Sequence, residues 1–476
     1  MVKIKNLQVN IEGTIAVDDV SFEVLDGSIL GIVGESGSGK TQTALAIAGL
    51  LSNESTMSGE IWLDDVCLSS LKGKERREYN GTKISVIFQE PMSSLNPLQK
   101  VGRQIDEVLR LHRKELNAAE RKERVLKILD EVEIDEPERV YNQYPHELSG
   151  GMRQRIVIAI ASILRPGLII ADEPTTSLDS ETAKSILALL MKLNKKYNRT
   201  ILFISHDLKV VRELCSEVLV MQGGKIVERG NVDAIFENPK EEYTKKLLES
   251  AYLKPKAETV EASEDLMLEV KDVSLYYNDK EDGFFGKRFR DYVLQGISFK
   301  VHKGQIVGIV GSSGKGKSTL AKAILGLHKE YDGEIICNVN NMQMVFQDPF
   351  DSLNPSMKVG DIIAEPLRVN HVCSRSEIKP RVIDMLEKVG LSAEYYDRMP
   401  DELSGGQRQR VSIALSLIGG CKFIVADEPC SALDVTVQKQ VMELFLKLQK
   451  EMGLTILLIS HDAELIGAMC DEVVEL

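Results

Sequence analysis

Short apolar runs alternate along the chain with longer stretches in which apolar residues recur every three or four positions. The runs at 28–33, 168–172 and 200–205 are rich in β-branched residues and are typical of buried strands. Residues 41–51 and 101–132 have helical spacing instead. Strands that alternate with helices predict a mainly parallel sheet covered by helices on both faces.

The same pattern occurs a second time further along the chain. Residues 305–310, 423–427 and 455–460 predict three buried strands, and 318–327 and 359–389 predict helices. Each matches a segment of the first series in the same order. The chain is therefore predicted to be a tandem repeat of one domain.

The predicted boundaries place the first domain at 1–250 and the second at 268–476, joined by a linker at 251–267. The linker is polar and acidic and has no apolar period. The second copy carries an insertion at 279–291, lacks a segment between its two glycine motifs, and has no counterpart of 222–250. The insertion, with Phe284, Phe285 and Lys287, is either a solvated hairpin tip or a contact surface.

A glycine-rich loop lies between the first predicted strand and helix of each core. GESGSGKT and GSSGKGKS present backbone N–H groups and a helix N-terminus to an anion. The strand-to-helix position favours a phosphate loop over an ordinary glycine-rich turn. Lys315 either contacts phosphate or is solvated. The residues expected to hold nucleotide are Gly34, Ser36, Gly37, Ser38, Gly39, Lys40 and Thr41 in the first loop, and Gly311, Ser313, Gly314, Lys315, Gly316, Lys317 and Ser318 in the second.

Each copy also has a pair of acidic residues at the end of a buried strand. We expect Asp172 and Asp427 to hold Mg²⁺ together with the hydroxyls of Thr41 and Ser318. Glu173 and Glu428 follow directly, and we expect them to polarise the attacking water as general bases.

A histidine ends another buried strand in each copy. His206 and His461 are predicted to bridge the γ-phosphate and the water. A structural histidine is the alternative, but matched positions after both acidic pairs favour the catalytic interpretation.

A second anion cradle in each copy consists of a serine and two glycines at a predicted helix start. Each cradle lies far along the chain from the phosphate loop of its own domain. Two anion sites in each domain would be explained if the domains pair head to tail, so that each cradle closes on the nucleotide of the other domain. The two cradles are Ser149-Gly150-Gly151 and Ser404-Gly405-Gly406.

With these motifs the chain resembles the ATP-binding cassette (ABC) ATPases over nearly its whole length. GESGSGKTQTALAIAGLL and FQEPMSSLNP are similar to one ATPase subunit of the oligopeptide/dipeptide/nickel importers. FQDPFDSLNP, ELSGGQRQR and DEPCSALDVTVQ are similar to its companion subunit. The resemblance implies a fusion of two P-loop NTPase domains, each with a mainly parallel core sheet, an antiparallel β-subdomain and a helical subdomain.

The resemblance also implies roles for further residues. Gln89 and Gln347 would sense the γ-phosphate and contribute to the metal site, and Asp179 and Asp434 would cross the dimer interface. The family usually stacks adenine on an aromatic residue. Tyr277 fits that position, but Ile11 occupies it in the first copy.

The implied function is hydrolysis of MgATP to drive an importer. Its implied partners are two transmembrane permease subunits and an extracellular substrate-binding protein, with the chain at the cytoplasmic face of the membrane. The transported substrate stays open among peptides, nickel and metal chelates.

Composition restricts the alternatives. The net charge of −13 argues against a nucleic-acid partner, and no apolar run is long enough to span a bilayer. The seven cysteines form no CxxC pair. The main rival is a soluble two-cassette ATPase acting on ribosomes or nucleic acid, and such proteins carry a long basic linker. An exporter ATPase is the second rival.

Overall fold

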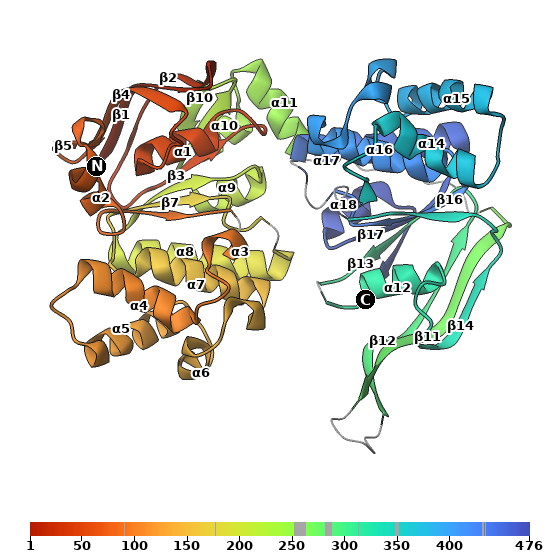
Figure 1. The fold of residues 1–476 in the computed structure, drawn as a ribbon, viewed down its shortest axis with the longest axis horizontal. Helices are drawn as coiled ribbons and strands as arrows, with labels where there is room; N and C mark the ends of the chain where they lie inside the picture. The colour runs from red at the N-terminus through yellow and green to blue at the C-terminus, as the bar shows by residue number, and fades with distance from the viewer. Residues whose placement is uncertain are drawn as a thin grey trace. The chain divides into compact units, whose positions relative to one another are not determined.

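The computed structural model describes residues 1–476 except 90, 177, 252–262, 281–287, 313, 348–351, 431–432 and 434. The chain forms two compact units, Met1–Tyr252 and Leu253–Leu476 (Figure 1). Ser313 and Asp434, two of the expected site residues, lie outside the described residues.

The first unit contains two sheets and the helices that surround them. Its strands are β1 (Val2–Ile11), β2 (Thr14–Val24), β3 (Ile29–Val33), β4 (Ser55–Leu63), β5 (Val66–Cys67), β6 (Ile84–Ile87), β7 (Leu168–Asp172), β8 (Thr200–Ile204), β9 (Glu217–Gln222) and β10 (Lys225–Asn231). Its helices are α1 (Lys40–Ala48), α2 (Gly73–Tyr79), α3 (Pro91–Ser94), α4 (Val101–His112), α5 (Ala118–Glu131), α6 (Pro137–Tyr141), α7 (Gly150–Ser162), α8 (Ser180–Tyr197), α9 (Leu208–Leu214), α10 (Val232–Glu237) and α11 (Glu242–Ala251), with short 3₁₀ turns at Leu68–Ser70 and Pro145–Glu147.

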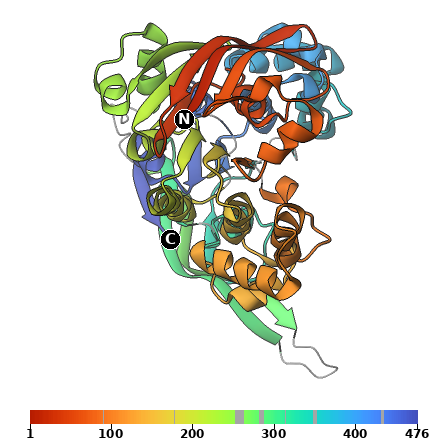
Figure 2. The same cartoon turned by 90° about the vertical axis from the view of Figure 1, so that its left-hand side faces the viewer.

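The larger sheet of the first unit has the strand order β10-β9-β3-β8-β7-β6, and every pair except β10 with β9 is parallel. The smaller sheet, β2-β1-β4-β5, is antiparallel. Figure 2 shows the antiparallel strands in red and helices α4–α6 in orange at opposite ends of this unit. A mainly parallel core with an antiparallel and a helical subdomain is the architecture that the family resemblance implies.

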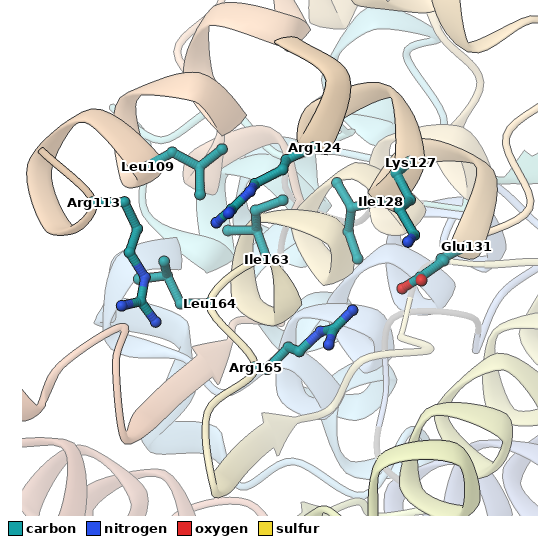
Figure 3. A pocket seen from close by; sticks show the side chains of 9 residues that line it. All are labelled: Leu109, Arg113, Arg124, Lys127, Ile128, Glu131, Ile163, Leu164 and Arg165. Carbon is teal, nitrogen blue, oxygen red and sulfur yellow. The ribbon is translucent and has the colours of Figure 1, made fainter. Parts of the chain in front are cut away.

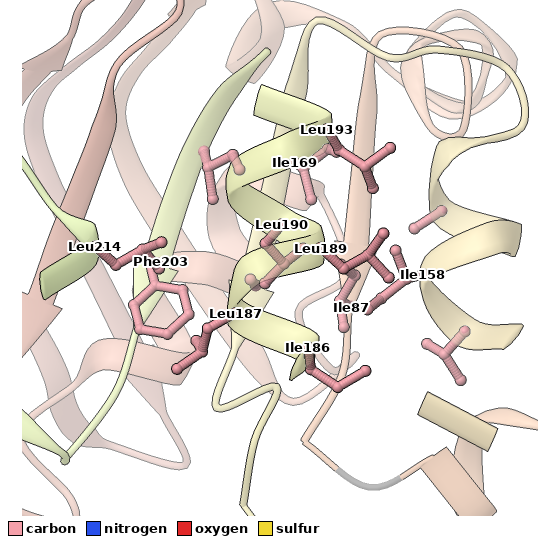
Figure 4. Packing of buried hydrophobic residues seen from close by; sticks show 14 of the residues in the cluster. Ile87, Ile158, Ile169, Ile186, Leu187, Leu189, Leu190, Leu193, Phe203 and Leu214 are labelled. Atoms are coloured by element: carbon pink, nitrogen blue, oxygen red, sulfur yellow. The ribbon is translucent and has the colours of Figure 1, made fainter. Parts of the chain in front are cut away.

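Alternate residues of the parallel strands serve two different cores. Leu30 and Ile32 of β3 pack with α1 and the antiparallel sheet. Ile169 of β7 and Phe203 of β8 face the opposite way, into the core formed with α7, α8 and α9. Figure 4 shows this second core, in which the apolar face of α8 covers the strands. Both faces of the sheet are therefore buried, one by α1 and the antiparallel sheet and the other by helices alone, which explains why the strand sequences are apolar throughout.

The stretch 101–132 folds as two helices. Helix α4 ends at His112, and Asn117 starts α5 with a reciprocal cap, in which its side chain accepts from the N–H of Glu120 and the Glu120 side chain accepts from the N–H of Asn117. Such a capping box is a strong helix start signal. The spacing of apolar residues predicts helix on both sides of this break and does not mark the break itself.

The second unit repeats this plan with fewer elements. Its strands are β11 (Leu266–Lys280), β12 (Arg288–His302), β13 (Ile306–Val310), β14 (Tyr331–Cys337), β15 (Met342–Val345), β16 (Phe423–Asp427), β17 (Thr455–Ser460) and β18 (Glu472–Glu475). Its helices are α12 (Lys317–Ile324), α14 (Val359–Val369), α15 (Arg375–Lys388), α16 (Gly405–Leu417), α17 (Val435–Met452) and α18 (Ala463–Met469), with 3₁₀ turns at Ala393–Asp397 and Pro400–Glu402.

The sheets of the second unit have the orders β15-β16-β17-β13-β18, all parallel, and β12-β11-β14, all antiparallel. Chain that forms β5 and α2 in the first unit is missing here, because β14 ends at Cys337 and β15 begins at Met342. The insertion lengthens the β11–β12 hairpin as far as the pair Lys280 and Arg288. Phe284, Phe285 and Lys287 lie beyond it, outside the described residues.

The predicted linker is shorter at both ends than expected. Helix α11 includes Ala251, and strand β11 begins at Leu266. Across the described residues, none of the helices combines the length and apolar character that a bilayer crossing demands.

Candidate nucleotide sites

The first phosphate loop curls around the side chain of Lys40. The Lys40 ammonium donates to the carbonyl oxygens of Gly34 at 2.8 Å and Glu35 at 2.9 Å, and the residue is only 6% exposed. Gly39, just before α1, has φ +100°, and a Cβ there would lie 2.5 Å from the carbonyl oxygen of Ala16. Only glycine fits that position, so the loop geometry depends on it.

The second phosphate loop has the same form. The Lys317 ammonium donates to the carbonyl oxygens of Gly311 at 2.7 Å and Ser312 at 3.0 Å. Gly316 precedes α12 in the left-handed conformation, as Gly39 precedes α1. Lys315 is exposed. Both lysines are therefore held above a helix N-terminus, where an anion is stabilised.

The aspartates that end β7 and β16 are buried beside these loops. The Thr41 hydroxyl donates to Oδ1 of Asp172 at 3.4 Å. Burial raises the pKa of Asp172 to about 6, and burial likewise raises the pKa of Asp427. Oδ1 of Asp427 is buried and has no hydrogen-bond partner among the described residues.

Glu173 is the centre of a hydrogen-bond network in the first unit. Its Oε2 accepts from Nε2 of Gln89 and from the Thr176 hydroxyl, each at 3.0 Å, and lies 3.0 Å from Nδ1 of His206. Burial pushes the pKa of Glu173 upward, but the hydrogen bond and charge of His206 outweigh it, so the pKa lies below its usual value. Glu173 is therefore ionised at neutral pH.

Glu428 has matching partners in the second unit. Its Oε2 accepts from Nε2 of Gln347 at 3.3 Å and lies 3.1 Å from Nδ1 of His461. Its Oε1 lies 3.5 Å from the ammonium of Lys317. The pKa of Glu428 is also lowered, because His461 and Lys317 outweigh the effect of burial.

The two histidines respond in the opposite direction. Burial lowers the pKa of His206, but the hydrogen bond and charge of Glu173 raise it more, so it lies above the ordinary 6.5. The hydrogen bond from His461 to Glu428 raises the pKa of His461 above the same value. Each pair therefore favours an imidazolium beside a carboxylate.

The serine of each second cradle caps a helix. Ser149 accepts from the N–H of Met152 at the start of α7, and Ser404 accepts from the N–H of Gln407 at the start of α16. A Cβ on Gly151 would lie 2.5 Å from Cγ2 of Thr182, and one on Gly406 would lie 2.3 Å from Cγ1 of Val437. The last glycine of each cradle is thus also required for close packing of two helices.

The remaining expected residues lie at the edges of the sites. Asp179 caps α8 by accepting from the N–H of Thr182. Tyr277 is 47% exposed, and its hydroxyl lies 3.2 Å from that of Thr319 in the first turn of α12. Ile11 is half-buried and packs against the core of its own unit. Tyr277 is therefore available to a planar ligand, and Ile11 is less so.

Two residues of the first site had no signal in the sequence. Thr176 binds Glu173, as described above. Tyr243 of α11 accepts from the N–H of Glu35 in the phosphate loop at 3.1 Å, across 208 positions of sequence. A helix cap or a motif can be recognised from neighbouring residues in the sequence. The contact between Tyr243 and Glu35 cannot, because it forms only when α11 folds back onto the phosphate loop.

The residues present suit both ATP and Mg²⁺. The loop N–H groups, the two lysines and a buried Ser38 hydroxyl that has no hydrogen-bond partner among the described residues suit phosphates. Asp172 with Thr41, and Asp427 with Ser318, are hard oxygen donors of the kind that bind Mg²⁺ together with substrate phosphates. The orphaned oxygen of Asp427 fits such a ligand.

The chain belongs to the ABC transporter family, whose profile matches residues 17–176 and 294–431. It is 42% identical over 482 residues to a peptidoglycan transport ATP-binding protein of Agrobacterium fabrum, covering 97% of this chain and 87% of that protein. It is 38% identical over 517 residues to a glutathione import ATP-binding protein of Pectobacterium atrosepticum, covering 97% and 82%.

A solved structure of an archaeal ribosome recycling factor, in complex with a ribosomal stalk protein, has a TM-score of 0.67. It is 21% identical and covers 98% of this chain and 87% of that one, so it shows the fold alone. The comparisons confirm the resemblance to importer ATPases and the tandem P-loop fold. This protein is an ATP-binding ABC transport ATPase.

Proposed function

We propose that the chain supplies both ATPase sites of an importer for peptides or peptide-containing compounds. The observation that carries this proposal is that both units have the same set of a buried lysine, an aspartate, a glutamate and a histidine in nearly the same geometry. A protein that hydrolyses ATP at one site needs these four residues in one unit only. Their presence in both units supports ATP hydrolysis at both sites.

In each site the ionised glutamate accepts a proton from the water that attacks the γ-phosphorus. The bond to the ADP oxygen then breaks, and ADP and phosphate leave. Histidine and glutamine hold the glutamate in place, as the hydrogen bonds to Glu173 and Glu428 indicate. The lysines neutralise charge on the phosphates. Mg²⁺, when bound by Asp172 and Thr41 or by Asp427 and Ser318, would stabilise charge on the phosphate oxygens.

We further propose that the sites are composite. Site one would comprise the first phosphate loop with Ser404, Gly405 and Gly406, and site two the second loop with Ser149, Gly150 and Gly151. The packing of each unit supports this, since α1 or α12 lies on one face of the sheet and α7 or α16, which begins at the cradle, lies on the other. Asp179 and Asp434 would meet across that interface.

The relatives support the proposed substrate class. Two relatives are named for peptidoglycan transport and for glutathione import, and both kinds of compound contain peptide bonds. Nickel and metal chelates are the alternatives from the sequence. We propose two transmembrane permease subunits and an extracellular binding protein as partners, and peripheral attachment at the cytoplasmic face of the membrane.

Coexpression with candidate permease subunits tests the proposal. We expect the chain to sediment with membranes only when the permeases are present. In proteoliposomes, a peptide-loaded binding protein should stimulate ATP hydrolysis and drive uptake of labelled peptide, whereas Ni²⁺ should not. Glu35→Gln, at an exposed acid of the phosphate loop, is the matched control for substitutions at Glu173. The proposed importer function would be refuted if the chain sedimented with ribosomes and not with permease-containing membranes.

A further inference from the structure

A cationic pocket lies in the helical part of the first unit, away from the nucleotide residues. It has a volume of about 370 Å³ and is lined by residues of α4, α5 and the chain just after α7. Figure 3 shows Arg113, Arg124, Lys127 and Arg165 around it, from three different segments. Leu109, Ile128 and Leu164 supply an apolar floor. The volume is within the range of small-ligand sites.

The pocket lining holds four positive charges and one carboxylate, Glu131. This carboxylate accepts from the Tyr197 hydroxyl at 2.8 Å and pairs with Lys196 at 3.3 Å. In the part of the chain that the structure describes, none of the four cations forms an ion pair with a carboxylate. A concentration of like charge over apolar walls focuses a positive potential. This local excess of positive charge contrasts with the net charge of −13 of the whole chain.

Arg165 occupies an uncommon backbone conformation. Its φ is +57°, in the left-handed region that favours glycine, and its guanidinium lies 4.9 Å from the ring centre of Tyr197. The matching position in the second unit is Gly420, with φ +79°. The fold therefore accepts glycine here, and the backbone alone does not call for an arginine, whose side chain contacts Tyr197 and lines the pocket.

The second unit shows which lining residues the fold itself requires. The helices match residue by residue, because Val101 and Val359 begin the first of each pair and Val125 and Val382 are fully buried in the second. Leu109, Ile128 and Ile163 have the apolar matches Leu367, Met385 and Ile418, whereas Leu164 is matched by Gly419. Of the cations, only Arg124 has a basic match, Arg381. His371, Asp384 and Gly420 replace the other three.

We propose that the cationic pocket binds a small phosphorylated anion, whose phosphate contacts the arginines and Lys127 while its apolar part lies on Leu109 and Ile128. A free phosphorylated compound and the headgroup of an anionic phospholipid share this chemistry. Planar guanidinium groups suit phosphate because they offer paired donors. This site goes beyond the ATPase function and does not depend on it.

Methyl-resolved NMR of the whole chain locates binding without using activity. With inorganic pyrophosphate as the probe, we expect shifts of the Ile128 and Ile163 methyl signals. The methyl of Ile418, the match of Ile163, is the internal control and should not move. Binding to the phosphate loops perturbs other methyls and is therefore distinguishable. The shifts should shrink as ionic strength rises.

Lys127→Asp with Arg165→Gly gives the first unit the residues that the second unit already has. We expect this variant to bind pyrophosphate roughly tenfold more weakly or worse, with basal ATP turnover at the wild-type level. Arg381→Ala is the matched control in the second unit, and it should change neither pyrophosphate binding nor ATP turnover. If the double variant does not fold, Arg124→Gln on the exposed face of α5 tests the same site.

A second arm separates the two sources of phosphate. Vesicles of phosphatidylglycerol with phosphatidylcholine are compared with vesicles of phosphatidylcholine alone. Recruitment by the anionic vesicles, lost in the double variant, supports a lipid headgroup, and pyrophosphate shifts without recruitment support a free compound. The proposal is overturned if neither pyrophosphate nor the anionic vesicles shift the methyl signals of the pocket. It is also overturned if only an acidic peptide such as polyglutamate shifts them.

Discussion

Nδ1 of His206 lies 3.0 Å from Oε2 of Glu173, and the matching pair His461 and Glu428 has a separation of 3.1 Å. In both units the same carboxylate oxygen also accepts from a glutamine that follows the strand β6 or β15. The glutamate is thus oriented by two elements that are far apart in sequence. A base held in this way needs no reorganisation when water arrives.

The first prediction concerns the two glutamates as bases. Glu173→Gln with Glu428→Gln keeps the size and most hydrogen bonds of the side chains but removes the proton acceptor. We expect ATP turnover to fall by about 10²–10⁴-fold. ATP should remain bound unhydrolysed, which rapid filtration of labelled nucleotide will detect.

Glu35→Gln is the control for this change, because Glu35 has an exposed side chain in the same loop. It should keep wild-type turnover. Wild-type turnover in the double glutamine variant would instead show that neither glutamate is the base.

The second prediction concerns the charge of the histidines. Both have a pKa above 6.5 in the folded protein because each faces an ionised glutamate. Glu173→Gln should lower the pKa of His206 and leave that of His461 unchanged. NMR titration of the ring protons measures this in nucleotide-free protein that contains a metal chelator.

The sign of the effect on stability follows from the direction of the shift. A raised pKa means that the folded state binds the proton more tightly than the unfolded state. The stabilisation that each histidine contributes is therefore present below pH 6.5, while its glutamate stays ionised, and is lost as the pH rises through the raised pKa of the histidine. A wild-type His206 that titrates below 6.5 would contradict the ionised pair.

Sequence reasoning predicted the parts of the fold that have local signals. The phosphate loops lie at strand-to-helix turns, Asp172 and Asp427 end buried strands, and the second core repeats the first. These features follow from periodicity and from glycine spacing within about ten residues. The ends of elements were less accurate, since α1 stops at Ala48 where 51 was expected.

Other features depend on contacts that no local pattern encodes. The bond between Tyr243 and the phosphate loop joins residues 208 positions apart. The packing need at Gly151 comes from Thr182 on another helix, so a glycine assigned to an anion cradle has a second role. The cationic pocket gathers Arg113, Arg124 and Arg165, whose spacing shows no motif.

The third prediction concerns adenine. Tyr277 is half-exposed beside α12, whereas Ile11 in the first unit is half-buried and aliphatic. Ile11→Tyr should tighten ATP at the first loop by roughly five- to tenfold, because an aromatic contact contributes about 1–1.4 kcal/mol. Tyr277→Ala should weaken ATP at the second loop by a similar factor.

Nucleotide titration of Lys317→Ala and Lys40→Ala backgrounds reports the first and the second loop separately. Equal affinities that Ile11→Tyr does not change would show that another residue already fills the adenine role in the first unit.

The fourth prediction concerns the tether between the units. Because residues 251–267 join them, an encounter between the units is intramolecular, with an effective concentration in the millimolar range. ATP turnover per molecule should therefore not change on dilution. Two separately expressed halves, 1–250 and 268–476, should lose turnover on dilution. A tethered chain that also loses turnover would show that the active sites form between molecules.

The last prediction tests which cradle serves which loop. Ser404→Arg places a bulky cation at the start of α16, where composite site one needs a tight anion cradle. Ser404→Ala is the milder comparison, since it removes the hydroxyl that caps the helix, worth about 1 kcal/mol, without adding bulk or charge to the cradle. Ser404→Arg combined with Lys317→Ala should leave no active site, because each change disables a different site.

Ser404→Arg combined with Lys40→Ala places both changes in site one and leaves the residues of site two unchanged. If the sites hydrolyse independently, only this second combination keeps activity, and if both must close together, neither does. Activity that survives with Lys317→Ala but not with Lys40→Ala would show that each cradle serves its own unit, because the one intact site would then be the first loop with Ser149.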